Sequence, residues 1–214
     1  MARVILGVTG SVAAVRTPIL RAALADAGHQ VRVVATEPAL HFFDPADLGP
    51  PDPDGGPLFR DADEWPPGRY RRGDPVLHVA FRDWADVLAI APLDANTLAK
   101  LALGLSDNFL TCLFRAWDFA KPVVLAPAMN TRMWESPVTL RHLRGLLDDH
   151  GRGPTDGSPR TVDEAAEAFA RRAPGMILVA PQAKRLACGD VGVGAMAEVV
   201  AIAEFIRLAA APPA

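Results

Sequence analysis

The segment Pro127–Trp134 carries side chains suited to holding a small polar group against an aromatic ring system. Asn130 offers an amide that both donates and accepts hydrogen bonds, and Met133 and Trp134 offer apolar surface. The preceding apolar run, 123–126, predicts a buried strand. The proline after it cannot donate to the hydrogen-bond ladder, so the segment leaves the sheet there. It does so at the carboxyl end of the strand, where open α/β sheets bind ligands. A plain strand, turn and helix with apolar residues facing the core is an equally good interpretation of these eight residues.

The turn Gly7–Val12, between the first predicted strand and helix, favours anion binding. Gly10 permits close backbone approach, and Thr9, Ser11 and the helix N-terminus offer donors, although any tight strand-to-helix turn favours such residues. The turn lacks the later glycine of the dinucleotide fingerprint and the Lys-Ser/Thr pair of a P-loop. We therefore expect a mononucleotide such as FMN rather than NAD or ATP, with Gly10, Ser11 and Val12 near its phosphate.

Two further strand ends bring polar and aromatic groups to the same edge. Thr36 and Phe42 follow the second predicted strand, where the threonine would meet the phosphate or ribityl chain and the phenylalanine would flank the flavin ring. A core aromatic that opens a short helix explains Phe42 equally well. Ala91–Thr97 repeats the strand-then-proline arrangement, and we expect Asn96 and Thr97 to cap the next helix.

Two residues are candidates for proton transfer. His78 lies in the apolar segment 74–79 and is the best candidate for a general base, because histidine is the usual proton acceptor near neutral pH, although a lone histidine in such a segment is more often structural. Cys188 lies in the glycine-rich stretch 185–194 beside two cations, and its thiol could donate a proton. Cys112, inside a predicted apolar helix, is expected to be a core residue.

Composition limits the class of protein. The 214 residues suit a single domain, 1–214, of which 50% are hydrophobic. A net charge of −3 without a dense basic cluster argues against nucleic-acid binding. Two distant cysteines do not make a disulfide framework, so we expect a cytoplasmic protein, and no histidine or cysteine spacing predicts a metal site. The apolar stretch 90–105 contains charged and polar residues, which argues against a membrane span.

Short β-rich runs alternate with helical patterns along the chain. Strands are predicted at 4–8, 31–35, 87–91, 123–126 and 176–180, and helices at 12–27, 96–105, 108–117, 136–148, 161–171 and 197–208. The helix at 161–171 is expected to open with a capping box at Thr161 and Glu164. Continuous apolar strands that alternate with helices predict an α/β fold, a parallel sheet covered on both faces.

Two segments interrupt this alternation. The Pro- and Gly-rich stretch 44–72 predicts a long, partly mobile loop that could serve as a lid or a subunit contact. The stretch 151–160, which is also rich in glycine and proline, is expected to be a surface linker.

Taken together, these segments resemble the flavin-containing cysteine decarboxylases. Residues 127–134 match the PxMNxxMW signature of that family in full. The other matching segments are 7–14, 61–65, 74–78, 91–97, 107–108 and 184–198. The resemblance runs from about 4 to 205, except near Pro50 and over an apparent insertion at 151–175. It implies a Rossmann-like, flavodoxin-type three-layer domain, with FMN bound between the subunits of a homotrimer or of a dodecamer of trimers.

The resemblance also implies a reaction. A flavin would oxidise the thiol side of a cysteine to a thioaldehyde, which provides the electron sink that lets its carboxylate leave as CO₂ and yields an enethiolate. His78 would act as base or orienting group, Asn130 would hold the carboxylate and Cys188 would protonate the enethiol. The substrate set implied is Ala128, Asn130 and Met133. The cofactor set is Gly10, Ser11, Val12, Thr36, Phe42, Asp94, Ala95, Asn96, Thr97 and Met129.

The acyl group of the N-acyl-cysteine substrate is less determined. Cys188 favours the coenzyme A branch of the family, which acts on phosphopantothenoylcysteine and makes a saturated thiol. Asp83 stands where that branch carries a cation, and the insertion at 151–175 could reshape a substrate clamp. The alternatives are therefore decarboxylation of the C-terminal cysteine of a ribosomally made peptide to an enethiol, and a flavin-binding regulator of phosphatases that needs no catalysis.

Overall fold

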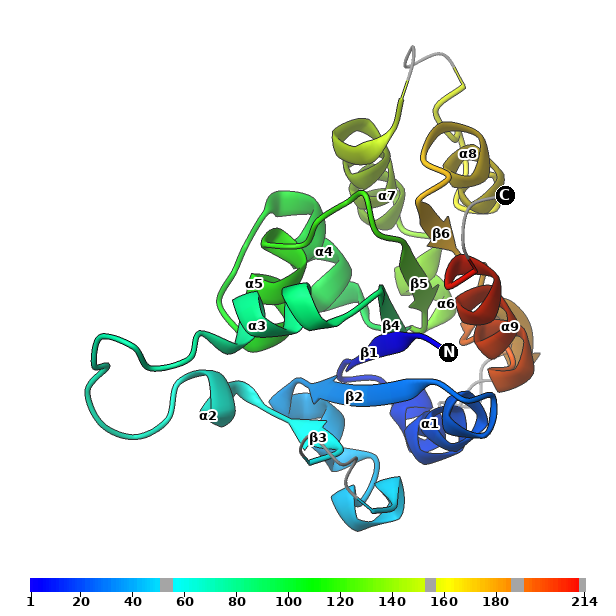
Figure 1. Ribbon diagram of the computed structural model, residues 1–214. Helices are drawn as coiled ribbons and strands as arrows, with labels where there is room; N and C mark the ends of the chain where they lie inside the picture. The colour runs from blue at the N-terminus through cyan, green and yellow to red at the C-terminus, as the bar shows by residue number, and fades with distance from the viewer. Residues whose placement is uncertain (51–55, 153–156, 186–190, 212–214) are drawn as a thin grey trace.

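The computed structural model describes residues 1–50, 56–152, 157–185 and 191–211. Six parallel strands form one sheet in the order β3-β2-β1-β4-β5-β6, the strand order of the Rossmann fold (Figure 1). The strands are β1 (Arg3–Val8), β2 (Gln30–Ala35), β3 (Leu58–Phe59), β4 (Val87–Leu93), β5 (Val123–Pro127) and β6 (Met176–Leu178). The predicted α/β class and parallel sheet are confirmed.

Helices cover both faces of the sheet because alternate strand residues point to opposite sides. Val4, Leu6 and Val8 of β1 face α1 (Thr17–Asp26) and α9 (Val199–Ala209). Ile5 faces the opposite layer. That layer holds α3 (Leu77–Trp84), α4 (Ala95–Leu103), α5 (Phe109–Arg115), α7 (Pro137–His150) and α8 (Ala165–Arg172).

The two central strands define where a ligand is expected. β1 pairs with β2 on one side, with Val4 opposite Val31, and with β4 on the other, with Val4 opposite Val87. The chain moves outward from β1 in one direction through β2 and β3, and in the other direction through β4, β5 and β6. The point between β1 and β4 is therefore a topological switch point, and the crevice outside the carboxyl ends of such strands is the usual ligand site.

The predicted helix 12–27 is divided in two. Residues 12–16 form the 3₁₀ helix η1 (Val12–Arg16), and α1 begins only at Thr17. Pro18 lies in the first turn of α1, where its missing N–H is harmless; inside a continuous helix it would remove a hydrogen bond. Gly28, with φ of +84°, follows the C-cap Ala27 of α1, a position where the left-handed backbone favours glycine.

The segment 44–72, predicted as a long loop, also carries short regular elements. The segment contains the short helix η3 (Pro45–Leu48), the strand β3 and the single-turn helix α2 (Asp61–Glu64). These elements are too short for a hydrophobic period to reveal them. Helix α3, which begins one residue before His78, was not predicted either.

The apparent insertion 151–175 contributes to the core. Its helix α8 packs against α7 and β6, with Ala165, Ala168 and Phe169 buried. The predicted capping box is wrong: Glu164 accepts from the backbone N–H of Arg160 at 2.7 Å instead.

In the described part of the chain, no helix is both long and apolar enough to cross a membrane.

Candidate active site

Three loops converge at the switch point around Gly10. They are the turn after β1, η2 (Glu37–His41) after β2, and the start of α4 after β4. A Cβ placed on Gly10 would lie 2.6 Å from Cβ of Pro38 and 3.3 Å from Oδ2 of Asp94. Only a glycine therefore lets these loops approach so closely, which agrees with the expected cradle.

Thr9 has a structural role that the sequence did not indicate. Its hydroxyl donates to the carbonyl of Pro92 at 2.9 Å and accepts from the N–H of Asp94 at 2.7 Å. The side chain is buried and joins β1 to the start of α4 across the switch point. Thr9 is therefore not an anion donor, whereas Ser11, whose Oγ accepts from the N–H of Ala13 at 3.4 Å, keeps its hydroxyl hydrogen to donate.

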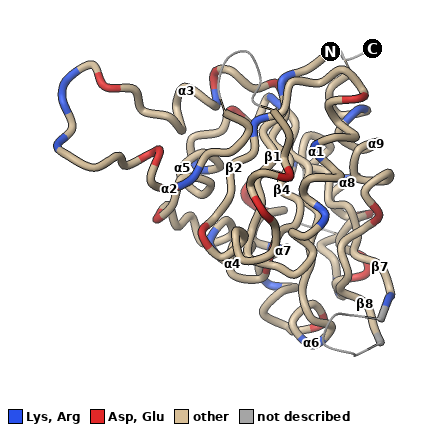
Figure 2. The backbone as a smooth tube through the Cα atoms, turned by 90° about the horizontal axis from the view of Figure 1, so that it is seen from below, with Lys and Arg blue, Asp and Glu red and all other residues tan. Residues whose placement is uncertain are grey.

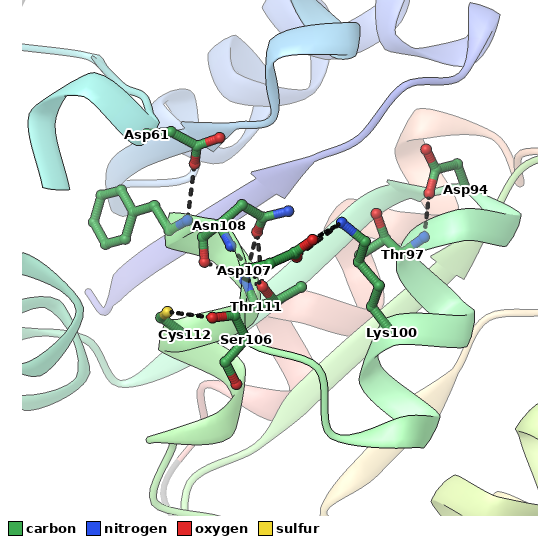
Figure 3. Close-up of polar contacts among 10 residues, drawn as sticks. Asp61, Asp94, Thr97, Lys100, Ser106, Asp107, Asn108, Thr111 and Cys112 are labelled. Atoms are coloured by element: carbon green, nitrogen blue, oxygen red, sulfur yellow. Dashed lines mark hydrogen bonds and ion pairs between the residues drawn. The ribbon is translucent and has the colours of Figure 1, made fainter. Parts of the chain in front are cut away.

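Asp94, rather than Asn96 or Thr97, caps α4. Its Oδ1 accepts from the N–H of Thr97 at 2.6 Å (Figure 3). Thr97 is buried beneath the first turn, and Asn96 is exposed beside Ala95 at the carboxyl edge of the sheet. The predicted capping residues are thus wrong, by two positions for Asn96 and three for Thr97, and residues 94–97 all follow the end of β4 directly.

The loop after β2 places Thr36 and Phe42 at the same edge. Thr36 is buried, and its N–H donates to the carbonyl of Val8 at 3.0 Å. Phe42 is half-buried against the core layer that contains α1 and α9, with its ring edge-on to His41 at 5.2 Å between centroids. Thr36 therefore lies beside the end of β1, next to the Gly10 turn.

The signature segment leaves the sheet as predicted. Pro127 ends β5, and Asn130 caps the single-turn helix α6 (Thr131–Trp134), with its Oδ1 accepting from the N–H of Arg132 at 2.9 Å. Met133 is 49% exposed, whereas Trp134 is 2% exposed and belongs to the core. The core interpretation therefore holds for Trp134, whereas the exposed Met133 stays a candidate site residue.

A β-hairpin packs over this segment. It consists of β7 (Gln182–Arg185) and β8 (Val191–Ala195), and the sequence did not predict it. The N–H of Met129 donates to the carbonyl of Gly194 at 2.9 Å. A Cβ on Gly192 would lie 2.5 Å from Oγ1 of Thr131, so the hairpin approaches too closely for any side chain there. Cys188 lies outside the described residues.

Glu198 ties the hairpin to the cradle turn. Its carboxylate binds Nζ of Lys184 in β7, accepts from Gln182 at 3.0 Å and pairs with Arg16 at the end of η1 at 2.9 Å. Hydrogen bonds from Lys184, Gln182 and Arg16 lower the pKa of Glu198 to about 2. The carboxylate therefore stays ionised across the ordinary pH range and holds the hairpin beside η1.

His78 lies in a different part of the molecule. It opens α3, which packs against α2 and α5, whereas α6 packs against β8. Figures 1 and 2 show α3 and α6 well apart. One chain therefore does not bring His78 next to Asn130. Nδ1 of His78 contacts Oε1 of Glu64 at 2.6 Å, a partner 14 residues away that the sequence did not single out.

Helix α5 is capped by side chains from two segments. Asn108 caps it from within, accepting from the N–H of Thr111 at 2.9 Å, and Asp61 accepts from the N–H of Phe109 at 2.8 Å (Figure 3). Cys112 is only partly buried in this helix, and its Sγ lies 3.4 Å from the carbonyl oxygen of Ser106. Burial and the nearby carboxylates raise the pKa of the Cys112 thiol, so a reactive role is disfavoured.

These observations outline a candidate site at the switch point, with the Gly10 turn, the exposed Met133 and the hairpin β7–β8 around it. The family model described as Flavoprotein matches residues 1–210, and the chain belongs to that family. The chain is 45% identical to phosphopantothenoylcysteine decarboxylase of Mus musculus over 206 residues. This aligned region covers 96% of the chain and 85% of the mouse protein.

Solved structures agree with this assignment. A PPC decarboxylase mutant in complex with pantothenoylaminoethenethiol aligns over 97% of both chains, with a TM-score of 0.77 and 45% identity. The FMN binding protein AtHal3 aligns over 97% of this chain and 95% of its own, with a TM-score of 0.74 and 45% identity. The FMN-dependent cysteine decarboxylase SpaF aligns over 99% and 98%, with a TM-score of 0.67 and 28% identity.

Proposed function

We propose that this protein is an FMN-dependent decarboxylase that acts on the cysteine carboxylate of phosphopantothenoylcysteine. Family membership and 45% identity to a phosphopantothenoylcysteine decarboxylase over nearly the whole chain support this proposal. The observation that carries it is the convergence of the Gly10 turn, the Asp94 cap and the Asn130 loop at the carboxyl edge of the central strands.

The residues present fit a flavin mononucleotide. The close approach at Gly10 leaves backbone and the Ser11 hydroxyl to face a phosphate, and the half-buried Phe42 offers a ring at the same edge. Bound FMN would supply the two-electron acceptor for oxidation at the thiol-bearing carbon. Oδ1 of Asn130 accepts from the N–H of Arg132, and an amide NH₂ group is the chemically suitable donor for the carboxylate-binding role proposed for Asn130.

Met133 and the hairpin would shape the substrate pocket. The exposed Met133 side chain provides soft apolar surface next to the Asn130 amide. The hairpin β7–β8 lies over the Ala128–Asn130 backbone through the Met129–Gly194 hydrogen bond, so it would exclude water from the reacting carboxylate. Cys188 is proposed as the proton donor to the enethiolate.

A complete site requires more than one copy of the chain. His78 and Asn130 lie in separate parts of one molecule, so a base at His78 can meet a carboxylate at Asn130 only if His78 comes from another subunit. Exposed Val12, Val15 and Ile19, at helical spacing on η1 and α1, provide an apolar strip next to the Gly10 turn for such a contact. We therefore propose a homotrimer with the site between subunits.

The test uses purified protein reconstituted with FMN. It is incubated with phosphopantothenoylcysteine and, separately, with a peptide that ends in cysteine, and the products are identified by mass. The proposal expects loss of CO₂ from the phosphopantothenoyl substrate, with at most slow reaction of the peptide. Preferential reaction of the peptide would transfer the assignment to the peptide branch, and no decarboxylation of either would refute it.

His78→Asn and Asn130→Asp serve as matched variants. Each removes one of the two proposed groups and leaves the other in place. If the site lies between subunits, mixing the two inactive variants restores part of the activity, because some interfaces then combine an intact His78 with an intact Asn130. Full activity in either single variant would contradict the roles assigned here.

A further inference from the structure

Glu64 holds His78 through two contacts. Its Oε2 accepts from the backbone N–H of His78 at 2.9 Å, and its Oε1 lies 2.6 Å from Nδ1 of the imidazole. The Glu64 side chain is 4% exposed, whereas that of His78 is 25% exposed. The carboxylate is therefore enclosed, and the ring that it holds still reaches the surface.

This arrangement determines which ring nitrogen can act. A carboxylate only accepts hydrogen bonds, so a neutral imidazole in this contact carries its hydrogen on Nδ1. Nε2 then has the lone pair and lies on the side of the ring away from Glu64. We propose that Glu64 is the positioning residue of His78, which fixes the Nδ1–H tautomer and presents Nε2 as the base that takes the substrate proton.

The turn that carries Glu64 is anchored to a neighbouring helix. Helix α2 is a single turn, and Asp61 at its other end accepts from the N–H of Phe109 in α5. Phe81 of α3 packs edge-on against the ring of Phe109, with centroids 5.3 Å apart. The turn that carries Glu64 and the helix that carries His78 are therefore both anchored to α5.

Glu64 also stabilises the charge that His78 acquires. When Nε2 takes a proton, the imidazolium lies beside an enclosed carboxylate, where charge attraction is stronger than in water. The same contact closes the base of the loop 65–76, which projects from the body and carries several basic residues (Figure 2). Loss of the carboxylate would release both the ring and the loop.

This inference relies on the proposed function for the role of His78, but its first measurement does not. The protein is labelled with ¹⁵N at its five histidines, and the His78 signal is identified by its absence in His78→Asn. Wild-type protein is expected to show the Nδ1–H tautomer for neutral His78. Glu64→Ala is expected to show a mixture of tautomers. An unchanged tautomer in Glu64→Ala would overturn the inference.

Kinetics provide the second measurement. Glu64→Ala is expected to lower kcat by at least about 10- to 100-fold, the range for removing a carboxylate that orients a metal-binding histidine, with little change in KM. Glu64→Gln keeps only one acceptor oxygen, which the backbone N–H of His78 requires, so its NH₂ group would face Nδ1. This variant is therefore expected to shift the neutral ring towards the Nε2–H tautomer and to lower kcat as Glu64→Ala does. FMN content is measured for each variant to exclude loss of the fold.

Asp63→Asn is the matched control. Asp63 lies on the same turn, is exposed, and accepts from the backbone N–H of Arg60 rather than contacting His78. Its variant is expected to keep both the tautomer and kcat. A tautomer change in Glu64→Ala in a protein that decarboxylates neither substrate would support the positioning role and refute the proposed function. Wild-type kcat in Glu64→Ala would overturn the inference.

Discussion

Gly10→Ala tests whether the cofactor lies at the switch point. The added Cβ would lie 2.6 Å from Cβ of Pro38, whereas carbon atoms pack at roughly 3.5–4.0 Å. The turn after β1 and helix η2 must therefore separate by about 1 Å at this point. Such overpacking costs typically about 1–3 kcal/mol.

That cost destabilises the turn that we propose to hold the FMN phosphate. If the FMN-bound form is destabilised by the full amount and the apoprotein is not, the Kd for FMN rises by about 5- to 150-fold, since about 1.4 kcal/mol is a factor of ten. The assay is titration of apoprotein with FMN, followed by quenching of flavin fluorescence. Circular dichroism and the unfolding temperature show whether the fold is retained.

Gly145→Ala is the control for the same substitution elsewhere. Gly145 lies inside α7, and its added Cβ would have its nearest neighbour, the carbonyl oxygen of Ala102, at 3.9 Å. Alanine in a helix interior is more stable than glycine by about 0.5–1 kcal/mol, so this variant should be slightly stabilised and bind FMN normally. An unchanged FMN Kd in Gly10→Ala would refute the placement of the phosphate at this turn.

Three further predictions concern the rest of the molecule. Gly194→Ala adds a Cβ 2.3 Å from the carbonyl oxygen of Met129 at a φ of +144°, so hydrogen exchange of the hairpin should accelerate and kcat should fall. Burial, opposed by Asp149 and reinforced by a nearby arginine, keeps the pKa of His150 below its ordinary value of 6.5. The unfolded chain therefore takes up a proton that the native state does not, and the free energy of unfolding, from denaturant titration, should fall as pH drops below 6.5. Because burial raises the pKa of Cys112, iodoacetamide should alkylate it more slowly than a cysteine in an unfolded peptide, as peptide mapping can measure.

Each of these predictions has a control and a contrary outcome. Gly175→Ala introduces contacts no closer than 3.9 Å and is the control for Gly194→Ala, so its hairpin should show wild-type hydrogen exchange. Wild-type hydrogen exchange in Gly194→Ala as well would contradict the prediction that the added Cβ loosens the hairpin. In His150→Phe the free energy of unfolding should depend less on pH below 6.5. An unchanged pH dependence in this variant would show that other groups cause it. Alkylation of Cys112 at the rate seen in the unfolded chain would show that its thiol is not shielded.

The local patterns in the sequence were sufficient for the main architecture. Five of the six sheet strands were predicted because each contains a mainly apolar run, interrupted in β2 by Arg32, as a strand covered on both faces requires. The exit of the signature segment from the sheet followed from Pro127, since a proline cannot donate to the ladder. Strand β3 and helix α2 escaped prediction because two and four residues are too few to show a period.

The site depends on contacts that the sequence could not indicate. Thr9 was expected to be an anion donor, but its hydroxyl donates instead to the carbonyl of Pro92, 83 residues away near the end of β4. Met133 is exposed and Trp134 is buried because of the way α6 lies against the core, which the sequence does not indicate.

The sequence by itself determined the strand and helix types, the glycine at the cradle turn and the resemblance to the flavin-containing cysteine decarboxylases, because these are properties of neighbouring residues. Only the tertiary structure decided that Glu64 holds His78 and that His78 lies apart from Asn130. The physical reason is that hydrogen-bond partners across a loop, and distances across a sheet, depend on strand order and on how helices pack, which residue spacing along the chain does not encode.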